Sequence, residues 1–343
     1  AGSCGPCRFG MYEAEYRLAL RNSGFDGFRV MLFQQTGGLG QSADDAGLEL
    51  NVDFALRLLN GVMMGDLLNE VAYQLRPYET EPGMVNRAFD KAMDHICTEM
   101  RTAGDKVGTA PGWWKLLPAK WRKKDLAKIL QQRWEPFYVN LMAEAREILD
   151  ADVRVDFTRP KPICKVTGEF WAQTTEGDGN FHMFEFLESQ GSEVLVETIT
   201  TWVNYLINQA RGKIVDTKGL NSSKGILGKL RGGLSHRIKL ARINIAKHFL
   251  NREYDRLRAA LGGTAHEQVC QLELQRMGHP YYNSKAAGGE GHLEVAKNIY
   301  YANKSLAHMV MSLKPFGCMP SAQSDGAQAA VTSHFPDMIY IPI

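Results

Sequence analysis

The sequence predicts an α/β chain with two lobes that contain parallel sheets, joined by a helical insert. Predicted strands and helices alternate at both ends of the chain, whereas a long middle segment shows only the helical spacing of apolar residues. With 343 residues, of which 44% are apolar, the chain can bury a core in each of two units. We place part of the first lobe in residues 1–45, the helical insert in 46–158 and the second lobe in 159–343.

The first predicted lobe contains one helix and one strand. Tyr12, Tyr16 and Leu20 recur at helical spacing, and Asn22-Ser23-Gly24 is a typical helix end. The apolar run Phe28–Phe33 is typical of a buried strand. We expect further parts of this lobe on a preceding segment, because the sequence does not begin with Met.

The middle segment predicts three helices, over 52–76, 84–102 and 122–149, separated by stretches that contain proline. Its basic run 121–124 has no aromatic-rich strand beside it, so it indicates a solvated helix start rather than a nucleic-acid surface. We therefore expect an insert or cap that does not bind nucleic acid.

The second predicted lobe begins after residue 158 and alternates strands with helices. The strands are expected at 163–168, 193–198, 309–313 and 338–343, and the helices at about 179–190, 200–261, 293–305 and between the last two strands. A strand, helix and strand in succession favour parallel pairing. The stretch 200–261 is a long helical excursion from this lobe.

The formal net charge of +2 conceals a basic segment at 211–258, which has thirteen Lys and Arg against three acidic residues. Such a segment is typical of a solvated helix, and the alternative is a surface for anions or a partner. No apolar run approaches the ~18 residues that a membrane span needs, and no signal peptide is recognisable, so we expect a cytoplasmic protein without membrane contact.

Cys4 and Cys7 are separated by Gly5-Pro6 and stand directly before a predicted helix. A thiolate at a helix N-terminus has a lowered pKa, which suits a thioredoxin-like redox pair. No strand precedes the motif, however, and the thiolates are equally suited to iron–sulfur or other metal ligation. The spacing alone leaves these alternatives and a structural role open.

The other four cysteines are scattered, and six in total are too few for a disulfide framework in a chain of this length. Cys318 follows a predicted strand, where ligands bind in open α/β sheets; a buried free thiol is the alternative. The pattern predicts core positions for Cys97 and Cys270 and a strand position for Cys164. Neither a P-loop nor a paired-histidine zinc motif is present.

Three motifs together resemble the 2-hydroxyacyl-CoA dehydratase and benzoyl-CoA reductase superfamily, namely those at 5–12 (GPCRFGMY), 167–170 (TGEF) and 315–320 (PFGCMP). The chain is most similar to the activase-related branch, which resembles double-cubane cluster proteins. The resemblance implies two Rossmann-like or flavodoxin-like lobes that face each other across a cleft. It also implies a 4Fe-4S cluster in that cleft, alone or paired as a double cubane.

By this resemblance, Cys7 and Cys318 are cluster ligands and Cys4 is a weaker candidate. The superfamily also has an upstream Cys-Pro ligand that this sequence lacks, so either Cys4 completes the site or the third ligand precedes the sequence given. Arg8 is expected to offset the negative charge of the cluster. ATP would act only through an activase partner or fused domain that injects electrons, and we expect a homodimer or pseudo-dimer.

Glu169 and Glu290 are the candidate proton donors, with a helix-start or turn carboxylate as the alternative for each. The loop 288–292 opens a predicted helix and is expected to line the cleft. The resemblance thus predicts an ATP-driven iron–sulfur reductase or dehydratase-like enzyme. The alternative is a non-catalytic cluster scaffold or electron relay in a larger activase fusion.

Overall fold

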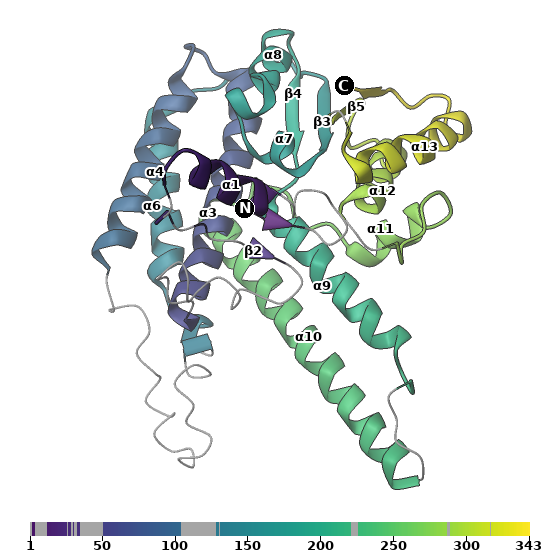
Figure 1. Ribbon diagram of the computed structural model, residues 1–343. Coiled ribbons are helices and arrows are strands. Elements are labelled where there is room, and N and C mark those ends of the chain that lie inside the picture. The colour runs from purple at the N-terminus through teal and green to yellow at the C-terminus, as the bar shows by residue number, and fades with distance from the viewer. Residues whose placement is uncertain are drawn as a thin grey trace.

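The computed structural model combines a bundle of long helices with a small parallel sheet (Figure 1). It describes residues 2–3, 12–25, 27–28, 30, 33–34, 51–103, 128–129, 131–220, 226–286, 289–315 and 317–343. Within these ranges, no helix is both long and apolar enough to cross a membrane.

The helical bundle has one continuous apolar core. Its members are α3 (Val52–Leu75), α4 (Met84–Thr102), α6 (Phe137–Asp152) and the C-terminal half of α10 (Ile226–Ala260). Leu250, Tyr254 and Leu257 of α10 are buried in the same core as Met63 and Met142. The helical segment expected as an excursion from the sheet lobe therefore completes the core of the insert.

α9 (Ile199–Asp216) and α10 lie side by side and project together from the body of the molecule (Figure 1). The projecting part of α10 is largely exposed, including the apolar residues Leu234, Ile238 and Ile245. Most of the basic segment 211–258 lies on this pair of helices.

The four-stranded sheet has the order β4-β3-β5-β6, and all of its strands are parallel. Its strands are β3 (Ile163–Gly168), β4 (Glu193–Val196), β5 (Met309–Leu313) and β6 (Tyr340–Pro342). The predicted parallel pairing is thus confirmed, because each connection between paired strands runs through at least one helix. The two outermost strands are shorter than expected.

Helices cover both faces of this sheet. The helices of this region are α7 (Phe170–Thr174), α8 (Met183–Ser189), α11 (Gln271–Gly278), α12 (Gly291–Asn303) and α13 (Met319–His334), with short 3-10 turns at Arg76–Tyr78 and Asp178–Asn180. On one face, Cys164 and Val166 pack against Phe184 of α8. On the other, Leu195 and Val310 pack against Tyr301 of α12.

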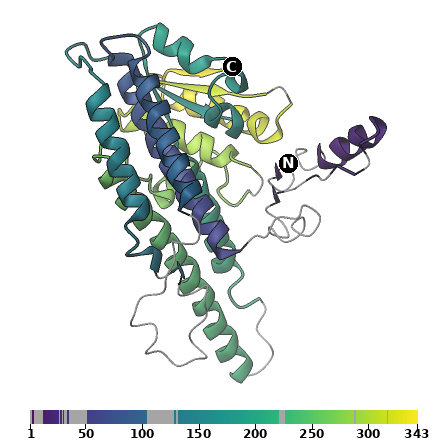
Figure 2. The ribbon, with the colours of Figure 1, turned by 90° about the vertical axis from the view of Figure 1, so that its left-hand side faces the viewer.

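The N-terminal part contains α1 (Tyr12–Asn22) and a two-residue parallel pairing of β1 (Gly2–Ser3) with β2 (Phe33–Gln34). In Figure 2, α1 stands apart from the bundle and the sheet, and its described side chains are almost all exposed. The predicted end of this helix is confirmed. Of the strand expected over residues 28–33, Phe33 begins β2, whereas Phe28 and Val30 lie outside any strand and Phe28 is 62% exposed; residues 29, 31 and 32 lie outside the described residues. A second lobe of Rossmann type is not seen among the described residues.

Candidate functional site

The candidate site lies at the carboxyl edge of the four-stranded sheet, where three strands pass directly into helix N-termini. Glu169, Thr198 and Cys318 are the N-cap residues of α7, α9 and α13. The Glu169 carboxylate accepts a hydrogen bond from the Ala172 N–H at 3.1 Å, and the Thr198 hydroxyl accepts one from the Thr201 N–H at 3.2 Å. Unpaired N–H groups give this edge a positive electrostatic potential.

The N-terminus of α12 adjoins that of α13. Glu290 is the N-cap residue of α12, and a Cβ atom on the next residue, Gly291, would lie 3.0 Å from the main-chain oxygen of Pro320. A larger residue would push the two helices apart at this point. The contact places Glu290 close to the start of α13 and therefore to Cys318.

A polar stripe of α12 faces the sheet. Residues three or four positions apart share one helix face, and those on this face are buried and polar: Glu290, Glu294, Lys297 and Tyr301. The sheet presents Lys165 and Ser312 to this stripe, and Glu197 follows the end of β4. Helical and strand periodicities thus bring two sets of polar side chains into one buried layer.

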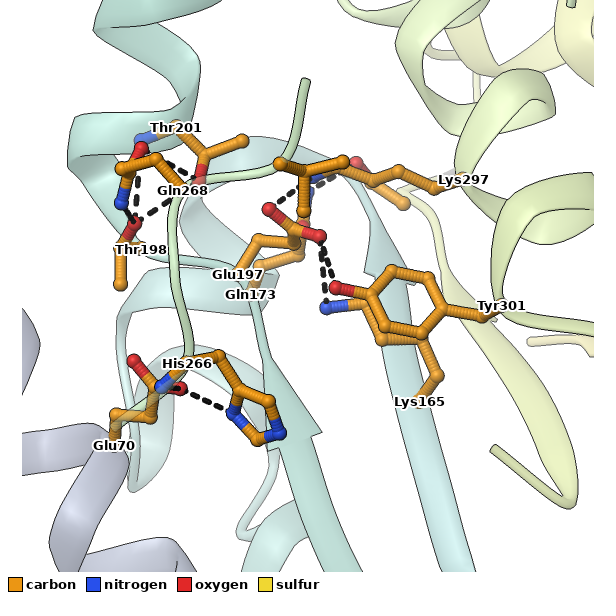
Figure 3. A network of polar contacts seen from close by, with 12 residues as sticks. Glu70, Lys165, Gln173, Glu197, Thr198, Thr201, His266, Gln268, Lys297 and Tyr301 are labelled. Atoms are coloured by element: carbon orange, nitrogen blue, oxygen red, sulfur yellow. Dashed lines mark hydrogen bonds and ion pairs between the residues drawn. The ribbon is translucent and has the colours of Figure 1, made fainter. Parts of the chain in front are cut away.

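Glu197 is the centre of the first polar group in this layer. Figure 3 shows Lys165, Lys297 and Tyr301 gathered around its carboxylate. The Tyr301 hydroxyl donates to Oε1 at 2.6 Å, while the Nζ atoms of Lys165 and Lys297 lie 3.6 and 3.9 Å from the carboxylate oxygens. Burial opposes ionisation of Glu197, but the two lysines outweigh it and lower its pKa to about 2.

Lys165 is a buried amine with incomplete hydrogen bonding. Its side chain is 0% exposed, and its Nζ has no hydrogen-bond partner among the described residues. Nζ lies 4.6 Å from the ring centroid of Tyr301. Burial lowers the pKa of Lys165 to about 7, although Glu197 opposes the change. This amine can therefore gain or lose a proton near neutral pH.

Glu294 is the centre of a second polar group, next to the first. Its carboxylate accepts hydrogen bonds from Ser312 and Ser324 at 2.6 Å each and lies 2.7 Å from Nζ of Lys314. Burial lowers the pKa of Lys314, but Glu294 and Asp325 raise it by more, so the net shift is upward. This group is a stable ion pair that holds α12 and α13 to β5.

The two predicted carboxylates, Glu169 and Glu290, are brought together at this edge. Burial first, and then the charge of Glu169, raises the pKa of Glu290 to about 7; burial also raises the pKa of Glu169. Glu290, Glu197 and Lys297 line a cavity of about 10 Å³, close to the space that one water molecule needs. Glu169 also caps α7, which is the structural role that we had weighed for it.

Two carboxylates of α3 hold separate segments beside the polar layer, Asp66 the start of α9 and Glu70 the loop before α11. Asp66 accepts hydrogen bonds from the N–H groups of Ile199 and Thr200 at 2.8 Å each, and burial raises the pKa of Asp66 to about 6. Glu70 accepts from the N–H of His266 at 2.7 Å and raises the pKa of its imidazole (Figure 3). The bundle thereby fixes the N-terminus of α9 and the loop before α11 at the site.

Of the predicted cluster residues, the structure places only Cys318. Cys4, Cys7 and Arg8 lie outside the described residues. Cys318 is a half-buried free thiol at the carboxyl edge of the sheet, as the sequence predicts. Among the residues that the structure describes, no three His, Cys, Asp or Glu side chains form a group suited to a metal ion.

The remaining cysteines differ from one another in burial. Cys164 is buried in β3, as expected, and burial raises the pKa of its thiol to about 11. The expected core positions of Cys97 and Cys270 are wrong, because both are exposed. Cys97 lies one position beyond the buried Ile96 of α4, on the outer side of the helix, and Cys270 is the N-cap of α11.

The buried polar layer, chiefly Lys165, Glu197, Glu294 and Lys297, was not among the predicted site residues. A signal was present for α12, because Glu290, Glu294 and Lys297 follow helical spacing in the sequence. Comparison of the chain with protein-family models, with curated proteins and with solved structures found no match in any of the three.

Proposed function

We propose that this chain is an iron–sulfur protein of the 2-hydroxyacyl-CoA dehydratase-like type, which reduces or dehydrates a substrate at the carboxyl edge of its sheet. The observation that supports the proposal is the position of Cys318, a free thiol at the N-cap of α13, whose first turn contacts the first turn of α12 at Gly291. The sixteen-residue helix behind Cys318 begins at this point, where the backbone N–H groups of its first turn can offset the negative charge of a cluster. Cys7 and Cys4 would supply the other thiolates, with Arg8 beside them.

When bound, the cluster would supply electrons of low potential that an ATP-hydrolysing activase partner delivers. The polar layer would supply the protons that such a reaction consumes. Burial raises the pKa of Glu290 to about 7, so this carboxyl group can exchange a proton near neutral pH. Lys165 titrates in the same range, and Glu197 and Lys297 lie between it and the cavity. These residues give the site acid groups that match neutral pH.

The test is the metal content of the full chain purified without oxygen. The protein is expected to be brown and to contain iron and acid-labile sulfide in similar amounts. Cys318→Ala and Cys7→Ala are each expected to remove most of this iron. Cys97→Ala is the matched control, because Cys97 is an exposed thiol on α4 in the helical bundle, and its iron content should equal that of the wild type.

Far-UV circular dichroism and thermal unfolding of each variant show whether the fold survives the substitution. Zinc as the only bound metal would contradict the proposal. Iron that stays unchanged in a folded Cys318→Ala variant would contradict it as well, because Cys318 is the one proposed ligand whose position is described.

A further inference from the structure

A second, much larger cavity adjoins the candidate site on the other side of α12. It has a volume of about 320 Å³ and lies between α9, α11 and the first turn of α12. Leu293 lines both cavities. A volume of this size is within the range of small-molecule sites, whereas the cavity at Glu290 is far below it.

The charge of this cavity is positive. Arg211, Lys213, Lys285 and Asp216 line it, and Lys285 pairs with Asp216 at 3.0 Å. Among the described residues, no ion pair or hydrogen bond engages the side chain of Arg211 or Lys213. Two cations are therefore free to bind an anionic group.

Two buried side chains of the lining have polar atoms without partners. Gln271 and His292 are each 3% exposed, and Gln271 Oε1 and His292 Nε2 make no hydrogen bond among the described residues. The neighbouring amides are already engaged: Asn208 donates to Gln275, which donates to Ser284, both at 3.2 Å. A buried polar atom without a partner is costly, so these two atoms indicate a ligand with polar groups.

His292 is neutral at physiological pH, because burial lowers its pKa to about 4. One ring nitrogen is hydrogen-bonded to the main chain of Gln275, so Nε2 remains as an acceptor, like the Gln271 oxygen. Hydroxyl groups satisfy such a combination. The apolar side chains of Leu272, Leu274 and Val215 complete the wall and provide contact area for the body of a ligand.

We propose that this cavity binds a phosphate ester with hydroxyl groups, of the size of a sugar phosphate or a mononucleotide. The phosphate would lie against Arg211 and Lys213, and the hydroxyl groups would reach Gln271 and His292. The proposal does not depend on the iron–sulfur function, because none of the four cysteines that the structure describes lines the cavity.

The test is isothermal titration calorimetry of the full chain at low ionic strength with AMP, ribose 5-phosphate and adenosine. At least one of the two phosphate esters is expected to bind with a Kd below roughly 1 mM. If AMP binds, adenosine is expected to bind about tenfold more weakly or worse, because it lacks the phosphate. Binding of AMP in preference to ribose 5-phosphate identifies a nucleotide as the ligand, and equal or stronger binding of ribose 5-phosphate identifies a sugar phosphate. Each result supports the proposal.

Variants locate the binding. Arg211→Gln and Lys213→Gln are each expected to weaken phosphate binding by about tenfold, because each removes a charge-assisted contact. Gln271→Leu is expected to weaken it by a smaller factor through the loss of a hydroxyl contact. Arg237→Gln on the exposed part of α10 is the matched control and should bind like the wild type. Circular dichroism checks that every variant is folded.

The proposal is overturned if neither phosphate ester binds, or if folded Arg211→Gln and Lys213→Gln variants bind as the wild type does. An equal loss in Arg237→Gln also overturns it, because that result would indicate general attraction of anions by the basic helices.

Discussion

Lys165 is expected to lose its proton near pH 7, and this is the sharpest prediction of the polar layer. The pKa falls from its ordinary value of 10.5 to about 7, since the amine is fully buried and Glu197 lies 3.6 Å away, beyond hydrogen-bond distance. Such a change corresponds to about 5 kcal/mol for holding the charged amine in this position. Desolvation therefore outweighs the attraction of the nearby carboxylate.

The assay is carbon-13 NMR of the full chain labelled at the lysine Cε position. One lysine signal is expected to titrate near pH 7, while the signals of exposed lysines titrate near 10.5. Lys165→Met should remove the early signal, because its side chain occupies a similar volume without a charge. Lys91→Met is the matched control, since Lys91 forms an exposed ion pair with Asp152.

The same pKa change affects stability. Between pH 7 and 10.5 the unfolded chain holds a proton that folded Lys165 has released, so the free energy of unfolding rises with pH. Over pH 7 to 9 this contribution is about 2.5 kcal/mol, and Lys165→Met should lack it in urea denaturation. If no lysine titrates below pH 9, or if Lys165→Met keeps the pH dependence of the wild type, the reasoning about burial is refuted.

Two further predictions concern stability. Gly168→Ala should lower the free energy of unfolding by about 3 kcal/mol or more, because φ is +113° and a Cβ would lie 2.1 Å from the Leu313 oxygen. Gly65→Ala in α3 should raise the free energy of unfolding by up to about 1 kcal/mol in the same urea titration, because a Cβ there meets open space. The free energy of unfolding of Glu290→Gln should equal that of the wild type at pH 4 and be higher by up to about 3 kcal/mol at pH 8. The reason is that the raised pKa of Glu290 makes the wild type lose stability as pH rises from 4.5 to about 7. Unchanged stability of Gly168→Ala, or of Glu290→Gln at pH 8, would contradict these two readings.

Much of the sheet could be predicted from local patterns. The strands at 163–168 and 309–313 have the predicted bounds, because apolar runs between glycine or proline turns are a local signal. The edge positions of Glu169 and Cys318 could also be predicted, because helix starts that follow parallel strands gather at one edge of the sheet.

The failures have a common cause. Phe28 has the apolar character of a strand residue but is exposed, and Cys97 lies one position from the buried face of α4. Successive side chains of an α-helix differ in direction by about 100°, so a shift of one position along α4 can move a side chain from the core to the solvent. Which face is buried depends on a neighbour from a distant part of the chain.

The sequence by itself determined the strand–helix alternation of the second lobe, the parallel pairing and the positions of Glu169 and Cys318 after strands, because these follow from periodicity and turn residues. Only the tertiary structure decided that α10 completes the bundle and that Lys165, Glu197 and Lys297 share one buried layer. Burial and the distances between charges set their pKa values, and both depend on segments more than 100 residues apart. That dependence is a property of the packed chain and has no counterpart in a local pattern.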